Sequence, residues 1–234
     1  MRVASISDTH IGSPEAQPDK VYNFITHEVP KLSLDKFIIA GDFFDLWLTD
    51  LKSAVEDHAR IMDSLSSLDS DVVILAGNHD WILANKVPEF FPFEVSATHT
   101  FNSGGRDFKA MHGHQFDLTS TDIRNTILSR TNRGASSKLY DLQMDYGIGL
   151  MSSIIQKLQM SPFRDKLTRV EKRARRSANE YLVWGHTHTA NINEDFVNAG
   201  DWTNLQNREA AFIGSEPTDK YALIDDGDVE IVEY

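Results

Sequence analysis

The sequence contains no cysteine among its 234 residues. This absence excludes disulfides, thiolate metal sites, iron–sulfur clusters and cysteine nucleophiles, and it fits a reducing compartment. The sequence also lacks any apolar run near the roughly 18 residues of a membrane-spanning helix. Its start, from Met1 to Asp8, turns polar too soon for a signal peptide. We therefore expect a soluble, cytoplasmic protein.

Positive charge is scarce as well. The chain has 23 Lys and Arg against 35 Asp and Glu, a formal net charge of −12. This balance disfavours nonspecific binding to nucleic acid. The scarcity is uneven, because residues 118–180 hold 12 basic and 6 acidic side chains, whereas the rest of the chain carries −18. This basic segment favours an anionic partner, but its compactness argues against a groove for duplex DNA.

The first half of the chain alternates strand and helix patterns. Apolar residues make up 41% of the sequence, enough for a sizeable core. Strands are expected at 2–7, 37–40 and 72–76, and helices at 18–28 and 53–68. This alternation predicts an α/β fold with parallel strands, whose ligands gather beyond the carboxyl ends of the strands.

The second half has a different pattern. Short strands are expected at 94–98 and 107–111, helices at 119–131, 136–160 and 164–181, and strands at 181–184, 196–197, 211–213, 221–224 and 229–232. Asp226-Gly227 is expected to form a hairpin turn. The chain is therefore predicted to have a core of residues 1–117 and 181–234, with the basic segment, 118–180, inserted as helices.

Five predicted strand ends share one composition, in which His, Asp or Asn stands beside other polar residues or Gly. They are Asp8-Thr9-His10, Gly41-Asp42-Phe43-Phe44-Asp45, Gly77-Asn78-His79-Asp80, His112-Gly113-His114 and Gly185-His186-Thr187-His188. Taken alone, a motif such as Asp8-Thr9-His10 is usually a turn. All five at strand ends favour a site for two metal ions. Oxygen and imidazole ligands without thiolate suit Mn²⁺, our first expectation, and also Fe²⁺, Zn²⁺ or Mg²⁺.

Together these motifs resemble those of the calcineurin-like metallophosphoesterase superfamily. The resemblance implies a four-layer α-β-β-α sandwich with a helical insertion acting as a lid. It implies two metal sites that share Asp42, and the ligands are Asp8, His10, Asp42 and His188 for one ion and Asp42, Asn78, His112 and His186 for the other. It also makes His79 the catalytic histidine, while Asp45 and Asp80 match positions that orient ligands.

The chemistry expected of such a site is phosphoester hydrolysis. Two nearby cations repel each other unless an anion lies between them, and the carboxylate of Asp42 would supply that anion. A hydroxide shared by both ions would attack phosphorus in line, and His79 would protonate the leaving group. A nucleophilic serine or cysteine is not required.

Three features are similar to the UDP-2,3-diacylglucosamine pyrophosphohydrolase branch of that superfamily. They are the segment from Gly41 to Trp47, the place of the helical insertion, and the segment from Val197 to Trp202. Two positions depart from the branch, because His79 stands where the branch has Arg and His114 stands where it has Asp. Both departures concern the rim of the site, so they bear on the substrate rather than on the reaction class.

The basic segment supplies further candidates for contact with a phosphorylated small-molecule or lipid-linked substrate. Arg169, Arg173 and Arg176 lie on a predicted basic helix, and Arg suits bidentate phosphate contacts. His114 is a candidate at the rim. A solvated helix face would explain such a run in isolation, but its place beside a metal site with a phosphoryl substrate favours phosphate contact. The same helix could contact an acidic membrane surface from the cytoplasmic side.

The leading hypothesis is therefore a two-metal phosphoesterase acting on a phosphodiester or pyrophosphate. The alternatives on the same core are a cyclic-nucleotide phosphodiesterase and a nuclease. A metal-free interaction scaffold is a third alternative, which the intact set of predicted ligands and His79 disfavours.

Overall fold

The computed structural model describes residues 1–46, 48–86, 91–116, 170–176, 179–203 and 219–234. The predicted helices at 119–131 and 136–160 and the predicted strand at 211–213 lie outside these ranges. Of the predicted helix at 164–181, residues 170–176 and 179–181 are described. Residues 170–176 are helical, but the predicted end is wrong, because residues 179–180 form a bend and a strand begins at Tyr181. The division into core and insertion therefore stays a prediction.

The first sheet contains the strands predicted in the first half, joined by the end of the chain. Its order is β11-β10-β1-β2-β3-β4, and its strands are β1 (Arg2–Ile6), β2 (Lys36–Ile39), β3 (Asp71–Leu75), β4 (Glu94–Ser96), β10 (Lys220–Asp225) and β11 (Asp228–Glu233). Strands β1 to β4 are parallel, as predicted. Strand β10 is antiparallel to β1 and to β11, so the sheet is mixed. The Asp226-Gly227 hairpin turn is confirmed.

The second sheet has the order β5-β6-β7-β9-β8. Its strands are β5 (Thr98–Ser103), β6 (Arg106–Met111), β7 (Tyr181–Trp184), β8 (Asn191–Ile192) and β9 (Phe196–Asn198). The central strands β6, β7 and β9 are parallel, and the edge strands are antiparallel to them. The single strand predicted at 94–98 is wrong, because the chain leaves β4 in one sheet and enters β5 in the other at Ala97.

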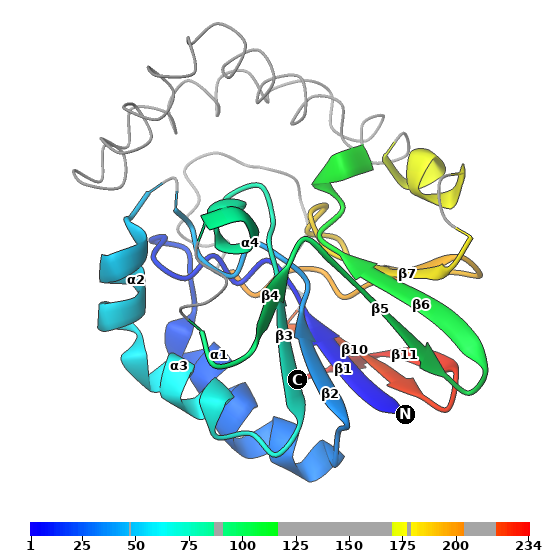
Figure 1. The fold of residues 1–234 in the computed structure, drawn as a ribbon, viewed down its shortest axis with the longest axis horizontal. Coiled ribbons are helices and arrows are strands. Elements are labelled where there is room, and N and C mark those ends of the chain that lie inside the picture. The colour runs from blue at the N-terminus through cyan, green and yellow to red at the C-terminus, as the bar shows by residue number, and fades with distance from the viewer. Residues whose placement is uncertain (47, 87–90, 117–169, 177–178, 204–218) are drawn as a thin grey trace, which may run out of the picture.

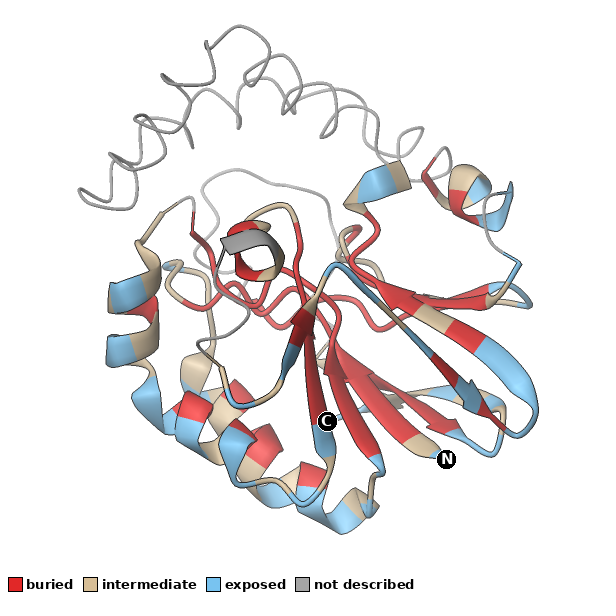
Figure 2. Cartoon of the chain, viewed as in Figure 1, coloured by how far each residue is buried: buried red, intermediate tan, exposed pale blue. Residues whose placement is uncertain are grey.

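Successive side chains of a strand point to opposite faces of its sheet, and this alternation produces three layers of buried apolar side chains. In β2, Phe37 and Ile39 pack toward the helices, whereas Ile38 packs toward the second sheet. In β7, Val183 faces the first sheet, whereas Trp184 packs beside Val170 and Ala174 of helix 170–176. The four-layer α-β-β-α arrangement is thereby confirmed for the described residues. Figure 1 shows the helices on the outer face of the first sheet, and Figure 2 shows the buried strands between the layers.

The helices follow the predicted pattern with local breaks. Helix α1 (Pro18–Asn23) continues as a π-helix, Phe24–Glu28, and a 3₁₀ helix, Val29–Leu32. Pro30 does not end this helical segment. It lies in the first turn of the 3₁₀ helix, where a backbone N–H would have no hydrogen-bond partner within the helix. The helix predicted at 53–68 begins earlier, as α2 (Leu51–Asp57), where Asp50 accepts a hydrogen bond from the Ser53 N–H at 3.0 Å. It is interrupted at His58 before α3 (Ala59–Ser66).

One short helix, α4 (Ile82–Lys86), follows the third motif and was not predicted. Its buried residues Ile82 and Leu83 pack into the core between the first sheet and its helices. Within the described ranges, no helix is both long enough and apolar enough to cross a membrane.

Candidate metal centre

All five motifs follow carboxyl ends of strands at one edge of the two sheets. The residues Asp8 and His10 follow β1, Asp42 follows β2, Asn78 and His79 follow β3, His112 follows β6, and His186 and His188 follow β7. Backbone hydrogen bonds join neighbouring loops. The N–H of His10 donates to the carbonyl of Asp42 at 2.9 Å, and the N–H of Gly185 donates to the carbonyl of His112 at 2.9 Å. Parallel pairing within each sheet therefore brings the motifs together.

The backbone at this edge is held in an uncommon conformation. Among the described non-glycine residues, eight have positive φ, and five of those are predicted ligands. These five are Asp8 (φ 54°), His10 (46°), Asp42 (49°), His186 (68°) and His188 (53°). A left-handed backbone costs a side-chain-bearing residue about 1–2 kcal/mol. Such strain persists only where the surrounding structure over-determines it, and it gathers at functional sites.

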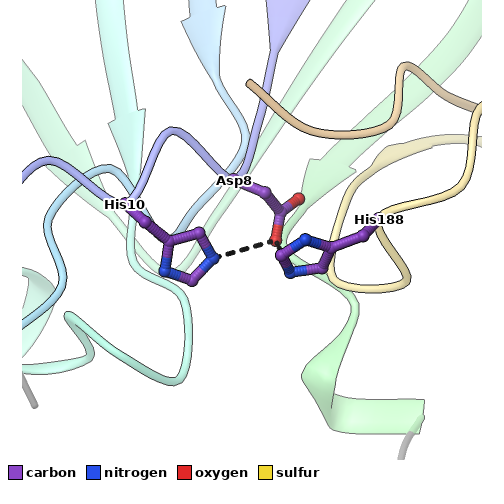
Figure 3. A group of neighbouring side chains, drawn as sticks. All are labelled: Asp8, His10 and His188. Carbon is purple, nitrogen blue, oxygen red and sulfur yellow. Dashed lines mark ion pairs between the residues drawn. The ribbon is translucent and has the colours of Figure 1, made fainter. Parts of the chain in front are cut away.

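Asp8, His10 and His188 form the first cluster, shown in Figure 3. The two imidazole rings lie on either side of the Asp8 carboxylate. Oδ1 of Asp8 is 3.9 Å from Nε2 of His10 and 3.3 Å from Nε2 of His188. The other oxygen of Asp8 accepts the backbone N–H of His186 at 2.9 Å, which links this cluster to the last motif.

Asp42 lies at the centre of the remaining groups. Its Oδ2 is 3.1 Å from Nε2 of His112, 3.8 Å from Nε2 of His10 and 4.0 Å from Nε2 of His79. Nε2 of His112 is also 3.1 Å from Oδ1 of Asn78. Asp42 is 1% exposed and His112 is fully buried. The carboxylate thus faces imidazoles from three other loops.

The imidazoles share one orientation. Nδ1 of His112 lies 3.0 Å from the Ala40 carbonyl oxygen, and Nδ1 of His188 lies 2.9 Å from Oδ2 of Asp201. Nδ1 of His10 faces Oδ2 of Asp45 at 3.4 Å. A carbonyl or carboxylate oxygen accepts from Nδ1–H, so Nε2 is the nitrogen that each ring turns toward the carboxylates of Asp8 and Asp42. With Nδ1 as the donor, Nε2 is the atom that binds a metal once it carries no proton.

At this edge of the sheets, the carboxylates and the imidazoles stabilise each other's charged forms. Burial opposes protonation of His112, but the charges of Asp42 and Asp8 outweigh it and raise the pKa of His112 to about 10. Burial likewise opposes the charged form of Asp42, yet the positive charge of His112 and His79 holds the pKa of Asp42 well below its usual value. The pKa of His10 is raised against burial by its contacts with Asp45 and Asp42. The carboxylates thus favour positive charge at the positions of the imidazoles.

These residues fit divalent cations. Oδ1 of Asp8 and Nε2 of His10 are buried and lack a hydrogen-bond partner among the described residues. Leaving a buried polar atom unsatisfied is costly, so native structures rarely do so without a ligand or functional reason. Both atoms belong to the cluster of Figure 3, and a cation bound there would satisfy them together.

His79 is held beside this centre by Asp45. Its Nδ1 lies 3.0 Å from Oδ1 of Asp45, and its side chain remains 19% exposed. The other oxygen of Asp45 faces His10, so one carboxylate contacts two imidazoles. Burial opposes the charge of Asp45, but the positive charge of His79 and the contact with His10 lower the pKa of its carboxyl.

Asp80 shapes the loops rather than facing the ligands. Its Oδ2 accepts the N–H of Phe43 at 2.8 Å and of Phe44 at 3.2 Å, and its Oδ1 accepts the N–H of Gly77 at 2.6 Å. Burial and the nearby charge of Asp42 raise the pKa of Asp80 to about 7, against these donors. The carboxyl group fastens the second motif to the third.

The remaining predicted site residues lie at or beyond the rim. The ring of His186 is 5.1 Å from that of His112, and the ring of His114 is 5.6 Å from it. His186 joins none of the His and Asp clusters formed by the described residues. Arg173 donates to the Phe116 carbonyl at 3.2 Å, and Arg176 is exposed. Arg169 lies outside the described residues.

Sequence reasoning did not predict the contact of Asp201 with His188. This residue is 1% exposed and contacts His188 through Nδ1. The signal available was its place in the segment from Val197 to Trp202, which is similar to a segment of one enzyme branch. Turn formation explains part of that segment, because Oδ1 of Asn198 accepts the Gly200 N–H at 2.9 Å.

The chain is similar to several known proteins. A curated relative, the UDP-2,3-diacylglucosamine hydrolase of Haemophilus ducreyi, is 23% identical over 216 residues, which cover 84% of this chain and 90% of the relative. Two solved structures also align. One is an archaeal phosphodiesterase with TM-score 0.47 and 12% identity, covering 99% of both chains. The other is the nuclease MPE of Pseudomonas putida with TM-score 0.45 and 12% identity, covering 98% of this chain and 87% of that one. The family of calcineurin-like phosphoesterases matches residues 1–190, and the chain belongs to that family.

Proposed function

We propose that this protein is a two-metal-dependent hydrolase that cleaves a phosphodiester or pyrophosphate bond. One observation carries the proposal. The Nε2 atoms of His10, His112 and His188 converge on the buried carboxylates of Asp8 and Asp42 within 3.1 to 4.0 Å. Membership in a phosphoesterase family supports the reaction class.

Each ligand has a defined task in this proposal. The first ion would be held by Asp8, His10, Asp42 and His188, and the second by Asp42, Asn78, His112 and His186. When bound, the ions acidify water to a nucleophile and neutralise the phosphoryl oxygens. Asp42 would lie between the two positive charges and lower their repulsion.

His79 would donate the proton to the leaving group. Asp45 accepts from its Nδ1 side and thereby directs Nε2 toward the centre, 4.0 Å from Oδ2 of Asp42. The partial exposure of its side chain leaves room for a substrate oxygen. Geometry and chemistry both suit a general acid.

For the substrate, we propose a lipid-linked nucleoside diphosphate of the UDP-2,3-diacylglucosamine type, cleaved at its pyrophosphate. The Haemophilus ducreyi relative supports this choice. The basic segment, residues 118–180, would bind the phosphates or an acidic membrane face from the cytoplasmic side, using residues such as Arg169, Arg173 and Arg176, with His114 at the rim.

Metal dependence is tested by chelation and reconstitution. The purified protein is stripped of metal and assayed on bis-p-nitrophenyl phosphate with Mn²⁺, Fe²⁺, Zn²⁺ or Mg²⁺ added singly. We expect activity to vanish on stripping and to return best with Mn²⁺ at two ions per chain. An unchanged rate after exhaustive stripping would contradict the proposal.

The substrate is tested by product analysis. The Mn²⁺-loaded protein is offered UDP-2,3-diacylglucosamine, soluble UDP-sugars, cyclic nucleotides and single-stranded DNA. Release of UMP from the lipid-linked compound supports our choice. Cleavage of cyclic nucleotides or DNA alone would replace it with a nucleotide phosphodiesterase or a nuclease.

Membrane contact is tested with charge reversal at Arg176, which is exposed. Arg176→Glu should weaken sedimentation with anionic vesicles, whereas Lys52→Glu, an exposed lysine on α2, should not. Arg173 is a poorer choice because it holds the Phe116 carbonyl. Equal binding by both variants would remove the membrane from the proposal.

A further inference from the structure

The segment from Asn198 to Thr203, here called the 198–203 bracket, contacts two motifs of the metal centre. We infer that Asp201 within it is a positioning residue, which holds His188 in the tautomer and orientation that present Nε2 to a cation. The inference rests on the proposed function, since it concerns one ligand of the proposed site. It adds a residue that the five motifs do not contain.

The contact between Asp201 and His188 is short, and Asp201 is buried. Oδ2 of Asp201 lies 2.9 Å from Nδ1 of His188 and also accepts the hydroxyl of Thr203 at 2.7 Å. Asp201 and Thr203 are each 1% exposed. A carboxylate accepts but does not donate, so this hydrogen bond places the ring hydrogen of the neutral imidazole on Nδ1. Nε2 faces Oδ1 of Asp8 at 3.3 Å, but that oxygen has no hydrogen-bond partner among the described residues, so this second contact does not fix a hydrogen on Nε2.

The bracket also connects to the first motif. The N–H of Trp202 donates to the Asp8 carbonyl at 3.2 Å, and the hydroxyl of Ser7 donates to the Gly200 carbonyl at 2.9 Å. The neighbours of Asp201 thus bind the Asp8 carbonyl and the Ser7 hydroxyl, while the side chain of Asp201 binds His188. The spacing between these two ligands is set from one short stretch of chain.

The other end of the bracket supports the last motif. Nδ2 of Asn198 donates to the Gly185 carbonyl and to the hydroxyl of Thr187, both at 2.8 Å. These residues flank His186 and precede His188, whose backbones are left-handed. The bracket itself is anchored by Trp202, which is fully buried and donates from Nε1 to the Lys220 carbonyl at 2.9 Å. Asp201 therefore stands on a rigid support, as a positioning residue must.

The test compares Asp201→Asn with a matched control. Glu94 contacts Nδ1 of His99 at the same 2.9 Å, on the strands β4 and β5 and outside the metal centre. Glu94→Gln therefore removes a carboxylate–imidazole pair without touching a proposed ligand. Binding of Mn²⁺ is measured by calorimetry, and kcat is measured at increasing Mn²⁺. We expect Asp201→Asn to weaken Mn²⁺ binding by about 10–100-fold and to recover kcat at saturating Mn²⁺.

A second readout does not depend on metal or activity. Long-range ¹H–¹⁵N spectra of the metal-free protein at mildly alkaline pH report which ring nitrogen of each histidine is protonated, with His188→Ala assigning the signal. We expect Nδ1–H for His188 in the wild type and loss of that preference in Asp201→Asn. Nε2–H in the wild type would overturn the inference, even if Asp201→Asn fails to fold.

The remaining outcomes separate the two proposals. Unchanged Mn²⁺ affinity in Asp201→Asn overturns the positioning role while the wild-type metal dependence stands. Equal losses in Asp201→Asn and Glu94→Gln also overturn it, because they would reflect general destabilisation. A wild type that binds no divalent cation overturns the proposed function, and the inference about Asp201 falls with it.

Discussion

Asp42 and Asp226 have the same backbone conformation in two different regions of the molecule. Both have φ of 49° and both adjoin a glycine with φ near 90°, Gly41 before the one and Gly227 after the other. Asp226 is exposed in the hairpin between β10 and β11, where turn geometry requires this conformation. Asp42 is buried among imidazoles, and tertiary contacts hold it there. The same local chemistry thus serves a turn in one place and a candidate metal centre in the other.

The strongest way to sharpen this comparison is Asp42→Asn. Asparagine has the same size and tolerates the left-handed backbone, so the change removes charge with little change in conformation. We expect activity to fall by about 10³-fold or more, since the proposed bridging charge is lost. Turnover of bis-p-nitrophenyl phosphate and Mn²⁺ content report the effect. Full activity would refute the bridging role of Asp42.

His79→Ala removes the proposed proton donor. We expect kcat to fall by about 10²–10³-fold on a substrate whose leaving group needs a proton, because general acids contribute on this scale. The loss should be smaller on bis-p-nitrophenyl phosphate, whose leaving group is stable as an anion. Metal content should stay at the wild-type level. Equal losses on both substrates would mean that His79 acts in another way.

Gly77→Ala tests how closely the loops approach Asp42. A Cβ at Gly77 would overlap the Asp42 carboxylate and lie 2.5 Å from its backbone nitrogen. We expect a loss of about 2–3 kcal/mol in the free energy of unfolding, together with weaker Mn²⁺ binding. Gly105→Ala is the control, because its Cβ would meet nothing within 4 Å and only its φ of +79° is strained. Urea unfolding should show a loss of only about 1 kcal/mol in the free energy of unfolding of Gly105→Ala. Equal losses in the two variants would contradict the close approach of Gly77 to Asp42.

Acidic pH should weaken Mn²⁺ binding. Protons and the cation compete for the same Nε2 atoms, and the carboxylates of Asp42 and Asp8 raise the pKa of His112 from 6.5 to about 10. Affinity should therefore rise about tenfold per pH unit for each proton displaced, at pH values below that pKa. In the metal-free protein the raised pKa of His112 stabilises the fold fully below about 6.5, and this contribution disappears as pH rises through about 10. Calorimetry in buffers of different ionisation enthalpy counts the protons, and a flat profile would contradict the competition.

The smallest effect is expected from Asp226→Asn. Asparagine suits the turn as well as aspartate does, and the exposed side chain faces solvent. The free energy of unfolding should change by less than about 0.5 kcal/mol, with activity unchanged. This variant is the isosteric partner of Asp42→Asn. A large loss of activity here would mean that the left-handed aspartate itself, rather than its surroundings, explains the effect at Asp42.

The sequence predicted the strand ends and the five motifs because each rests on local signals. A short apolar run followed by Gly and polar residues marks a buried strand and its loop, as at residues 72–80. The break at His58 and the change of sheet at Ala97 were not predictable in the same way. Both depend on which layer the next residues pack against, and that information is distributed over the whole core.

The amino-acid sequence alone specifies which chemistry is available: oxygen and imidazole ligands without thiolate, carried on the ends of parallel strands. How these groups face one another depends on the tertiary structure. It brought Asp201 to His188 across a loop and Asp45 to both His10 and His79. It also held five predicted ligands in a backbone conformation that their own residue types do not favour. The physical reason is that imidazole orientation and backbone strain are set by hydrogen bonds between loops that are distant in the sequence.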